Sequence, residues 1–290
     1  MLSTDATVAQ RIQDGFEALT RAERQLANII LENYPVSGLG SITTLALNGD
    51  VSTPTVARMA RKLGFGGFPE MQAQLRAELE ATISDPITKH NKWAAAAPDT
   101  HILNRFADNV IDNLRNTLKH LSAEEFDRIV DLLSDTNHTV AVVGGRLSHS
   151  LASYFFTHMQ MMRDGVTLIE RNSSSWPHYL LSLKEGDILV AFDMRRYEQD
   201  MLRFAEMAKK RGVRIILFTD QWGSPAGKFA SHQVHSRIEV PSTWDSSVVT
   251  MFILEAIISA VQNQSWETSK ARMEDLENLF GKTRLFRKFI

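Results

Sequence analysis

The chain has 290 residues, of which 43% are hydrophobic and 23% charged, so a wholly disordered chain is excluded. At about 150 residues per domain, this length predicts two domains or one large domain. No cysteine is present, which excludes disulfide scaffolds, thiol catalysis and cysteine metal sites. The formal net charge of −2 gives no overall basic signature, so any contact with nucleic acid must come from a local basic patch.

Targeting and membrane segments are not expected. The longest apolar stretch, Val248 to Val261, is shorter than the ~20 residues of a membrane span, and it carries Glu255. Residues 1–10 lack the basic and apolar pattern of a secretory signal. We therefore expect a cytoplasmic protein with no membrane partner.

Residues 1–82 have the pattern of an all-α domain that contains a helix-turn-helix. Ser41 can open a short helix, and Asn48-Gly49-Asp50 is a turn signal. Ser52 is a good cap for a second helix, expected to run to about Leu63. In such motifs the second helix enters the major groove of DNA with its N-terminal residues at the base edges.

The outer face of this second helix is basic and rich in hydroxyl groups. The candidate DNA-binding residues are Ser52, Thr53, Thr55, Arg58, Arg61 and Lys62. The three cations are spaced three and four residues apart, so they share roughly one face, while Val56, Met59 and Leu63 would point into the core. The pattern predicts binding to double-stranded operator DNA by a dimer; the alternative is a simple solvated charged face.

The helical spacing of apolar residues is lost after residue 82. Residues 83–100 have little periodicity and are predicted to be a linker, with partly helical structure as the alternative. From residue 101 to 290, short apolar strands alternate with helices, which favours a three-layer α/β/α domain built on a parallel sheet. The expected strands are Thr139–Val143, Val166–Ile169, Asp187–Phe192, Val213–Phe218 and Gln233–Val240.

Candidate effector-binding residues follow these strands, because ligands bind beyond the carboxyl ends of parallel strands. They are Gly144, Gly145, Arg146, Ser148, Asp193, Arg195, Arg196 and Ser224. The glycine turn offers free N–H groups at a helix start, and arginine binds carboxylate or phosphate bidentately. The alternative for the arginines is a surface loop in which they pair with Asp193 or Glu198. His232 and His235 lack a carboxylate pair nearby, so neither a metal nor a cofactor is expected.

The order of these parts resembles the RpiR/MurR family of bacterial transcription regulators over nearly the full length. The segment Val51-Ser-Thr-Pro-Thr-Val-Ala-Arg-Met-Ala-Arg-Lys-Leu-Gly-Phe-Gly-Gly-Phe68 is similar to the family's VS-x-x-TV-x-R-x-x-x-x-LG-(F/Y)-x-G-(F/Y) signature. The resemblance implies an N-terminal helix-turn-helix domain, which places Ser52, Thr53, Thr55, Arg58 and Arg61 at DNA. It also implies a C-terminal SIS (sugar isomerase) domain that binds carbohydrate derivatives and dimerises.

The ligand loops depart from the family pattern. Arg146 replaces the second glycine of G-x-G-x-S, and S-x-S-G-(E/D)-T is replaced at its serine, glycine and threonine positions by Asp193, Arg195, Arg196 and Glu198. The hydroxyl groups that cradle a sugar phosphate are therefore absent. This favours a small carboxylate-bearing metabolite as effector, with a phosphosugar second.

The prediction is a ligand-responsive regulator of a catabolic operon, most simply a repressor, which acts as a homodimer or homotetramer. The alternative is an SIS-type phosphosugar isomerase or lyase, for which an acid or base is needed near the sugar carbons. Glu170, His178 and Glu255 are available, but no spacing marks any of them, and no catalytic residue is assigned. An enzyme would also have no need for residues 41–68.

Overall fold

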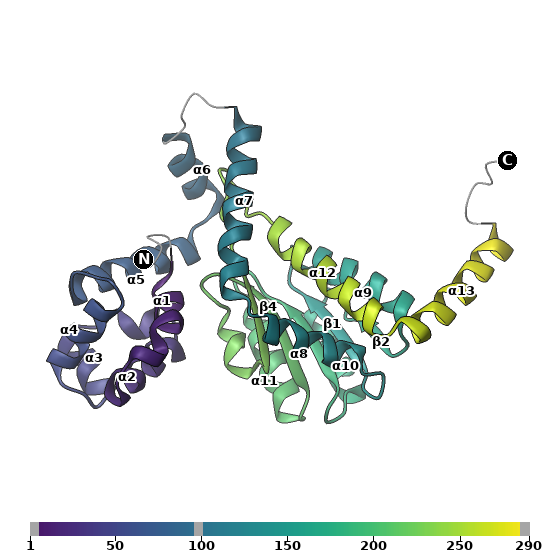
Figure 1. The fold of residues 1–290 in the computed structure, drawn as a ribbon, viewed down its shortest axis with the longest axis horizontal. Coiled ribbons are helices and arrows are strands. Elements are labelled where there is room, and N and C mark those ends of the chain that lie inside the picture. Colours follow the sequence, from purple (N-terminus) through teal and green to yellow (C-terminus); the bar gives the residue numbers. More distant parts are fainter. Residues whose placement is uncertain (1–5, 96–100, 285–290) are drawn as a thin grey trace.

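The computed structural model describes residues 6–95 and 101–284, which form a helical unit and a sheet-containing unit (Figure 1). The helical unit comprises α1 (Val8–Gly15), α2 (Arg21–Glu32), α3 (Ile42–Asn48), α4 (Thr53–Lys62) and α5 (Phe68–Ile83). α6 (Pro86–Ala95) and the long α7 (Ile102–His120) follow, between the two units. The expected linker thus contains a helix, while residues 96–100 lie outside the described ranges.

The second unit is built on a five-stranded parallel sheet of order β2-β1-β3-β4-β5. Its strands are β1 (Val140–Gly144), β2 (Val166–Leu168), β3 (Ile188–Phe192), β4 (Arg214–Asp220) and β5 (His232–Ser236). Its helices are α8 (Ala123–Ser134), α9 (His149–Met162), α10 (Trp176–Ser182), α11 (Gln199–Lys210), α12 (Val248–Gln264) and α13 (Trp266–Thr283). The predicted α/β class and three-layer arrangement are confirmed.

Two apolar cores cover the two faces of the sheet. On one face, β1, β3 and β4 pack against α8, α9 and α12, with Phe155 and Phe192 among the fully buried side chains. On the other face, alternate residues of the same strands pack against α10 and α11, where Trp176 lies over Phe204 with ring centroids 5.1 Å apart. Burial on both faces explains why these strands are continuously apolar.

The helical unit has a separate core formed by α1 to α5. The Thr20 hydroxyl accepts a hydrogen bond from Glu23 N, and the Glu23 carboxylate accepts one from Thr20 N, which is the capping box that the spacing predicts for α2. Val56, Met59 and Leu63 are buried, which confirms the inner face expected for α4. The unit therefore folds around its own apolar centre and presents the opposite face of α4 outward.

Two expectations need correction. The fifth strand ends at Ser236, not Val240, because the chain beyond it leaves the sheet and approaches Pro241. α10 was not expected, since a seven-residue helix is too short for a clear period. Within the described ranges, no single helix is long and apolar enough to cross a membrane, and α12 and α13 meet that test only as a pair bent by 100°.

Candidate DNA-binding and effector sites

The helix-turn-helix geometry is set by α3 and α4. Ser41 accepts a hydrogen bond from Thr44 N at 3.0 Å and so caps α3. The turn after α3 contains Asp50 with a φ of 48°, which a short polar residue tolerates better than a branched one. Pro54 lies in the first turn of α4, where its missing N–H costs nothing. The sequence thus fixes both helices and the turn between them.

The structure presents part of the predicted DNA-binding set on the outer face of α4. Ser52, Arg58 and Arg61 are exposed, and Thr53 is half-exposed. Thr55 is buried, and its hydroxyl oxygen lies 2.9 Å from Ser52 Oγ and accepts a hydrogen bond from Arg58 at 3.0 Å. Thr55 is therefore placed to orient its two neighbours rather than to reach a base.

Lys62 differs from the two arginines in that its charge is already paired. Its ammonium group lies 2.7 Å from Glu23 Oε2, and the Glu23 side chain is only 2% exposed. This ion pair ties the end of α4 to α2. The exposed cations that remain on the face are Arg58 and Arg61, whose arrangement suits contact with phosphate or a guanine edge.

A cavity opens at the carboxyl edge of the sheet, between the ends of β1 and β3, the start of α12 and the start of α6. Its lining includes Arg146, Leu147, Ser148, Met194, Arg195, Arg196, Ile238, Thr243, Trp244, Asp245, Ser246, Ser247 and Thr250, together with Ser84, Pro86 and Lys89. Four cationic side chains and one carboxylate thus surround it. The cavity is electrostatically suited to an anion.

Four of the eight predicted effector residues line this cavity: Arg146, Ser148, Arg195 and Arg196. The other four lie behind it. Gly144 and Gly145 are buried in the turn, and Asp193 is 2% exposed, accepting a hydrogen bond from the Ser224 hydroxyl. Burial raises the pKa of Asp193 to about 7. The hydrogen bond from Ser224 lowers this pKa in part, while the negative charge of Asp220 raises it further.

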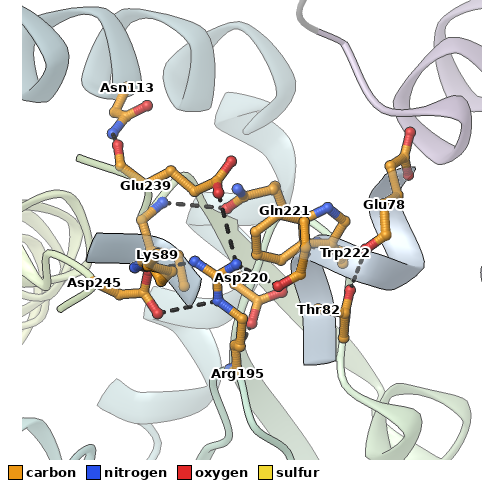
Figure 2. A network of polar contacts seen from close by, with 12 residues as sticks. Glu78, Thr82, Lys89, Asn113, Arg195, Asp220, Gln221, Trp222, Glu239 and Asp245 are labelled. Carbon is orange, nitrogen blue, oxygen red and sulfur yellow. Dashed lines mark hydrogen bonds and ion pairs between the residues drawn. The ribbon is translucent and has the colours of Figure 1, made fainter. Parts of the chain in front are cut away.

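Arg195 is held by internal partners rather than left open to a ligand (Figure 2). Its side chain is 2% exposed and pairs with Asp245 at 3.1 Å through Nε and with Glu239 at 3.6 Å. It also donates to the carbonyl oxygen of Ala81 at 2.6 Å and lies 4.4 Å from the centroid of the Trp222 ring. Arg195 therefore connects the sheet edge to the end of α5, and its carboxylate partners are Asp245 and Glu239 rather than the Asp193 or Glu198 of the alternative interpretation.

The same carboxylate serves a second cation. Asp245 Oδ1 accepts a hydrogen bond from the Lys89 ammonium group on α6, and the same oxygen also accepts one from the Arg195 guanidinium group. Lys89 is buried, with 7% of its side chain exposed. Asp245 thus joins the sheet unit to α6 and, through Arg195, to α5.

Sequence reasoning missed the cavity residues Lys89, Asp245 and Thr250. Asp245 and its neighbours in Trp244-Asp-Ser-Ser247 form a polar cluster before an apolar helix, a signal that could have been read as another loop at the sheet edge. Lys89 lies in the predicted linker, residues 83–100, where no sequence motif distinguishes it from its neighbours. The two histidines lie outside the cavity and have partners of their own. His232 Nδ1 lies 2.9 Å from Glu125 Oε1, and His235 Nδ1 lies 3.0 Å from the Asp220 carbonyl oxygen.

An N-terminal helix-turn-helix unit joined to a parallel-sheet unit with an anion-suited cavity defines a two-part regulator. Comparison with known families supports this: the helix-turn-helix domain of the rpiR family matches residues 6–82, and the SIS domain family matches residues 132–260. The chain belongs to the RpiR family of DNA-binding transcription regulators, in which a helix-turn-helix domain precedes a SIS domain.

Individual proteins with similar sequences or folds include transcription regulators. The chain is 26% identical over 266 residues to the HTH-type transcriptional regulator HexR of Pseudomonas aeruginosa, covering 87% of this chain and 88% of HexR. It is 28% identical over 230 residues to the bifunctional protein glk of Paraburkholderia xenovorans; the match covers 79% of this chain but only about a third of that relative's length (35%). Its fold is similar to that of the Vibrio vulnificus NanR protein complexed with ManNAc-6P, with a TM-score of 0.56 at 18% identity, covering 97% of this chain and 100% of NanR.

Proposed function

We propose that the chain regulates a catabolic operon by binding operator DNA through Ser52, Thr53, Arg58 and Arg61, as a homodimer or homotetramer in the cytoplasm. We assign residues 1–82 to DNA binding, 83–100 to the linker and 101–290 to effector binding and dimerisation. Thr55 and Lys62 support this face through their bonds to Arg58 and Glu23. Two-fold symmetric regulators read two half-sites, which raises affinity without a strongly basic domain.

We propose further that a small anionic metabolite binds in the cavity at the sheet edge and changes the affinity for DNA. The observation that carries this proposal is the cavity wall itself. Ser84, Pro86 and Lys89 come from the segment that follows the DNA-binding unit, while the arginines come from the SIS unit. A ligand there would touch the SIS unit and the linker that leads from the DNA-binding unit, and contact with a segment joining the two sites is what coupling between them requires. Release from the operator, hence repression, is the expected sign.

Two effector classes have support. A phosphosugar is the first to test, because the structurally similar NanR is complexed with ManNAc-6P. A carboxylate-bearing metabolite is the second, because the chain lacks the serine and threonine hydroxyls expected after β3 and has Asp193, Arg195 and Glu198 there. Both classes fit a cavity lined by four cations.

An enzymatic role has weaker support. Isomerisation needs an acid or base in reach of the sugar carbons. Glu170, His178 and Glu255 do not line the cavity, and Glu255 accepts a hydrogen bond from Tyr154 at 3.0 Å on the outer side of α12. Relatives over most of the chain length are regulators, although the matched glk protein is bifunctional.

A gel shift tests the proposal directly. Purified protein is titrated against the promoter regions flanking its own gene at fixed salt with competitor DNA, since such affinities depend steeply on salt. We expect a specific shift that phosphosugars or small carboxylates reverse. A protein that binds no DNA specifically, yet interconverts phosphosugars, would refute the regulator assignment and establish the enzyme.

A further inference from the structure

The glycine turn after β1 is already occupied by an acidic side chain of the protein. Glu198 Oε1 accepts a hydrogen bond from Arg146 N at 2.7 Å. The same oxygen lies 2.8 Å from the point that a Cβ on Gly145 would occupy, so the carboxylate rests against the turn. Gly145 N donates to Ser148 Oγ at 2.9 Å. The N–H groups of Gly145 and Arg146, which could otherwise receive a ligand anion at the turn, therefore have partners within the chain.

An unfilled polar position lies on the opposite wall of the cavity, at the start of α12. Thr250 is completely buried, and its hydroxyl has no hydrogen-bond partner among the described residues. A threonine in a helix commonly bonds a carbonyl one turn back, so an unpaired hydroxyl on a cavity wall is unusual. α12 is 17 residues long, and Ser247 provides no side-chain cap for its first turn. Val248 N donates to Ser246 Oγ at 3.3 Å, and the other N–H groups of the first turn, together with the positive end of the helix dipole, favour an anion.

The cations at the cavity divide into two groups. Lys89 and Arg195 share Asp245 and are largely buried. Arg146 and Arg196 are exposed, and within the described ranges neither guanidinium group makes a hydrogen bond or ion pair with a neighbouring side chain. These two arginines therefore have donors available for a ligand.

We propose that the anionic group of the effector binds at the N-terminus of α12, where Thr250 Oγ1 donates to it and Arg146 and Arg196 neutralise its charge, and not at the glycine turn. The inference rests on the proposed effector cavity and specifies where in it the acid group lies. Glu198 has the complementary role: by holding the turn closed to anions, it directs the ligand across the cavity to α12.

The test uses the full chain and inorganic phosphate, which carries the anionic group alone, with ManNAc-6P as the sugar-bearing probe. Affinity is measured by isothermal titration calorimetry for wild type, Thr250→Val, Thr250→Ser and Arg146→Ala. Valine matches threonine in shape but lacks the hydroxyl. We expect the affinity for phosphate to fall about tenfold in Thr250→Val and Arg146→Ala, and to be retained in Thr250→Ser, as for loss of a charge-assisted hydrogen bond.

A stability measurement separates a binding role from a structural one. Removing an unsatisfied buried hydroxyl relieves its desolvation cost, so ligand-free Thr250→Val should melt about 2–4 °C higher than wild type. Ser236→Ala is the matched control, because Ser236 Oγ is likewise fully buried and unpaired but lies outside the cavity. It should gain stability and keep the wild-type affinity for phosphate.

Two outcomes overturn the proposal: no binding of either probe by wild type, or unchanged affinity in Thr250→Val. If the affinity is unchanged in Thr250→Val but changes in Glu198→Gln, the anion lies at the glycine turn. The gel shift against operator DNA stays independent of these results. A wild type that binds phosphate as expected but no operator would refute the regulator function and leave the subsite intact.

Discussion

Replacing Arg195 by alanine removes the side chain on which the two units converge. The guanidinium is almost fully buried and has four partners: Asp245, Glu239, the Ala81 carbonyl and the Trp222 ring. Its loss leaves the Ala81 carbonyl at the end of α5 without this donor and leaves Asp245 with Lys89 alone.

The magnitude follows from burial and the number of partners. Breaking a buried ion pair by deleting one member costs about 3–5 kcal/mol. Asp245 is a quarter exposed and keeps Lys89, so a value at or slightly below that range, roughly 2–3 kcal/mol, is appropriate here. For a domain of this size, each kcal/mol lost from the free energy of unfolding lowers Tm by about 2–4 °C. We therefore expect Arg195→Ala to melt roughly 4–12 °C below wild type.

Thermal unfolding followed by circular dichroism measures this shift. The control is Arg203→Ala, which removes an exposed pair with Asp200 at 3.8 Å that should contribute under about 0.5 kcal/mol. A Tm for Arg195→Ala that matches Arg203→Ala would refute the reasoning, because it would show that the four contacts of Arg195 contribute nothing beyond those of a surface residue.

Three further predictions concern the DNA face, the buried acid and the glycine turn. Arg58→Ala should weaken operator binding in a gel shift while the free energy of unfolding changes by less than about 0.5 kcal/mol, since the side chain is exposed; wild-type operator affinity would count against the assigned face. Burial raises the pKa of Asp193 to about 7 in the folded chain, so the folded protein keeps a proton that the unfolded chain has lost. Relative to Asp193→Asn, the stability of wild type should be highest below about pH 4 and fall by on the order of 4 kcal/mol as the pH rises to about 7, as measured by urea unfolding across that range; a flat difference would show that Asp193 ionises normally. A Cβ at Gly144 would lie 2.7 Å from backbone atoms of His149, whereas at Gly145 it would meet only a flexible side chain; Gly144→Ala should therefore lose about 1–3 kcal/mol and Gly145→Ala much less in the same unfolding assay.

The elements whose signal is local could be predicted from sequence. The first four strands lie within two residues of their expected ends, because each is an apolar run bounded by turns. The helix-turn-helix was likewise predictable, since a cap at Ser41, a turn and an apolar face occur within about 25 residues, although the expected cap at Ser52 makes no capping bond and its hydroxyl lies against that of Thr55 instead. The fifth strand is shorter than its apolar pattern predicts, because Ile238 and Val240 beyond Ser236 make their backbone hydrogen bonds outside the sheet.

The candidate site was less predictable because its partners are remote in sequence. Arg195 and Asp245 are 50 residues apart, and Glu198 and the turn at Arg146 are 52 apart. Sequence alone placed an arginine at the sheet edge but could not show that its charge is matched there. The unpaired hydroxyl of Thr250 has no sequence signature at all, since a missing partner is a property only of the folded chain.

The links between the two units also bear on the order in which the chain assembles during synthesis. The helical unit is built from contacts close in sequence, which form quickly, whereas a parallel sheet depends on distant strands and forms slowly. The Arg195–Ala81 contact spans 114 residues and the Lys89–Asp245 contact spans 156. Domains near the N-terminus fold first on the ribosome. The DNA-binding unit can therefore fold before Asp245 has emerged, and the Lys89–Asp245 contact forms only after all five strands of the sheet have been synthesised.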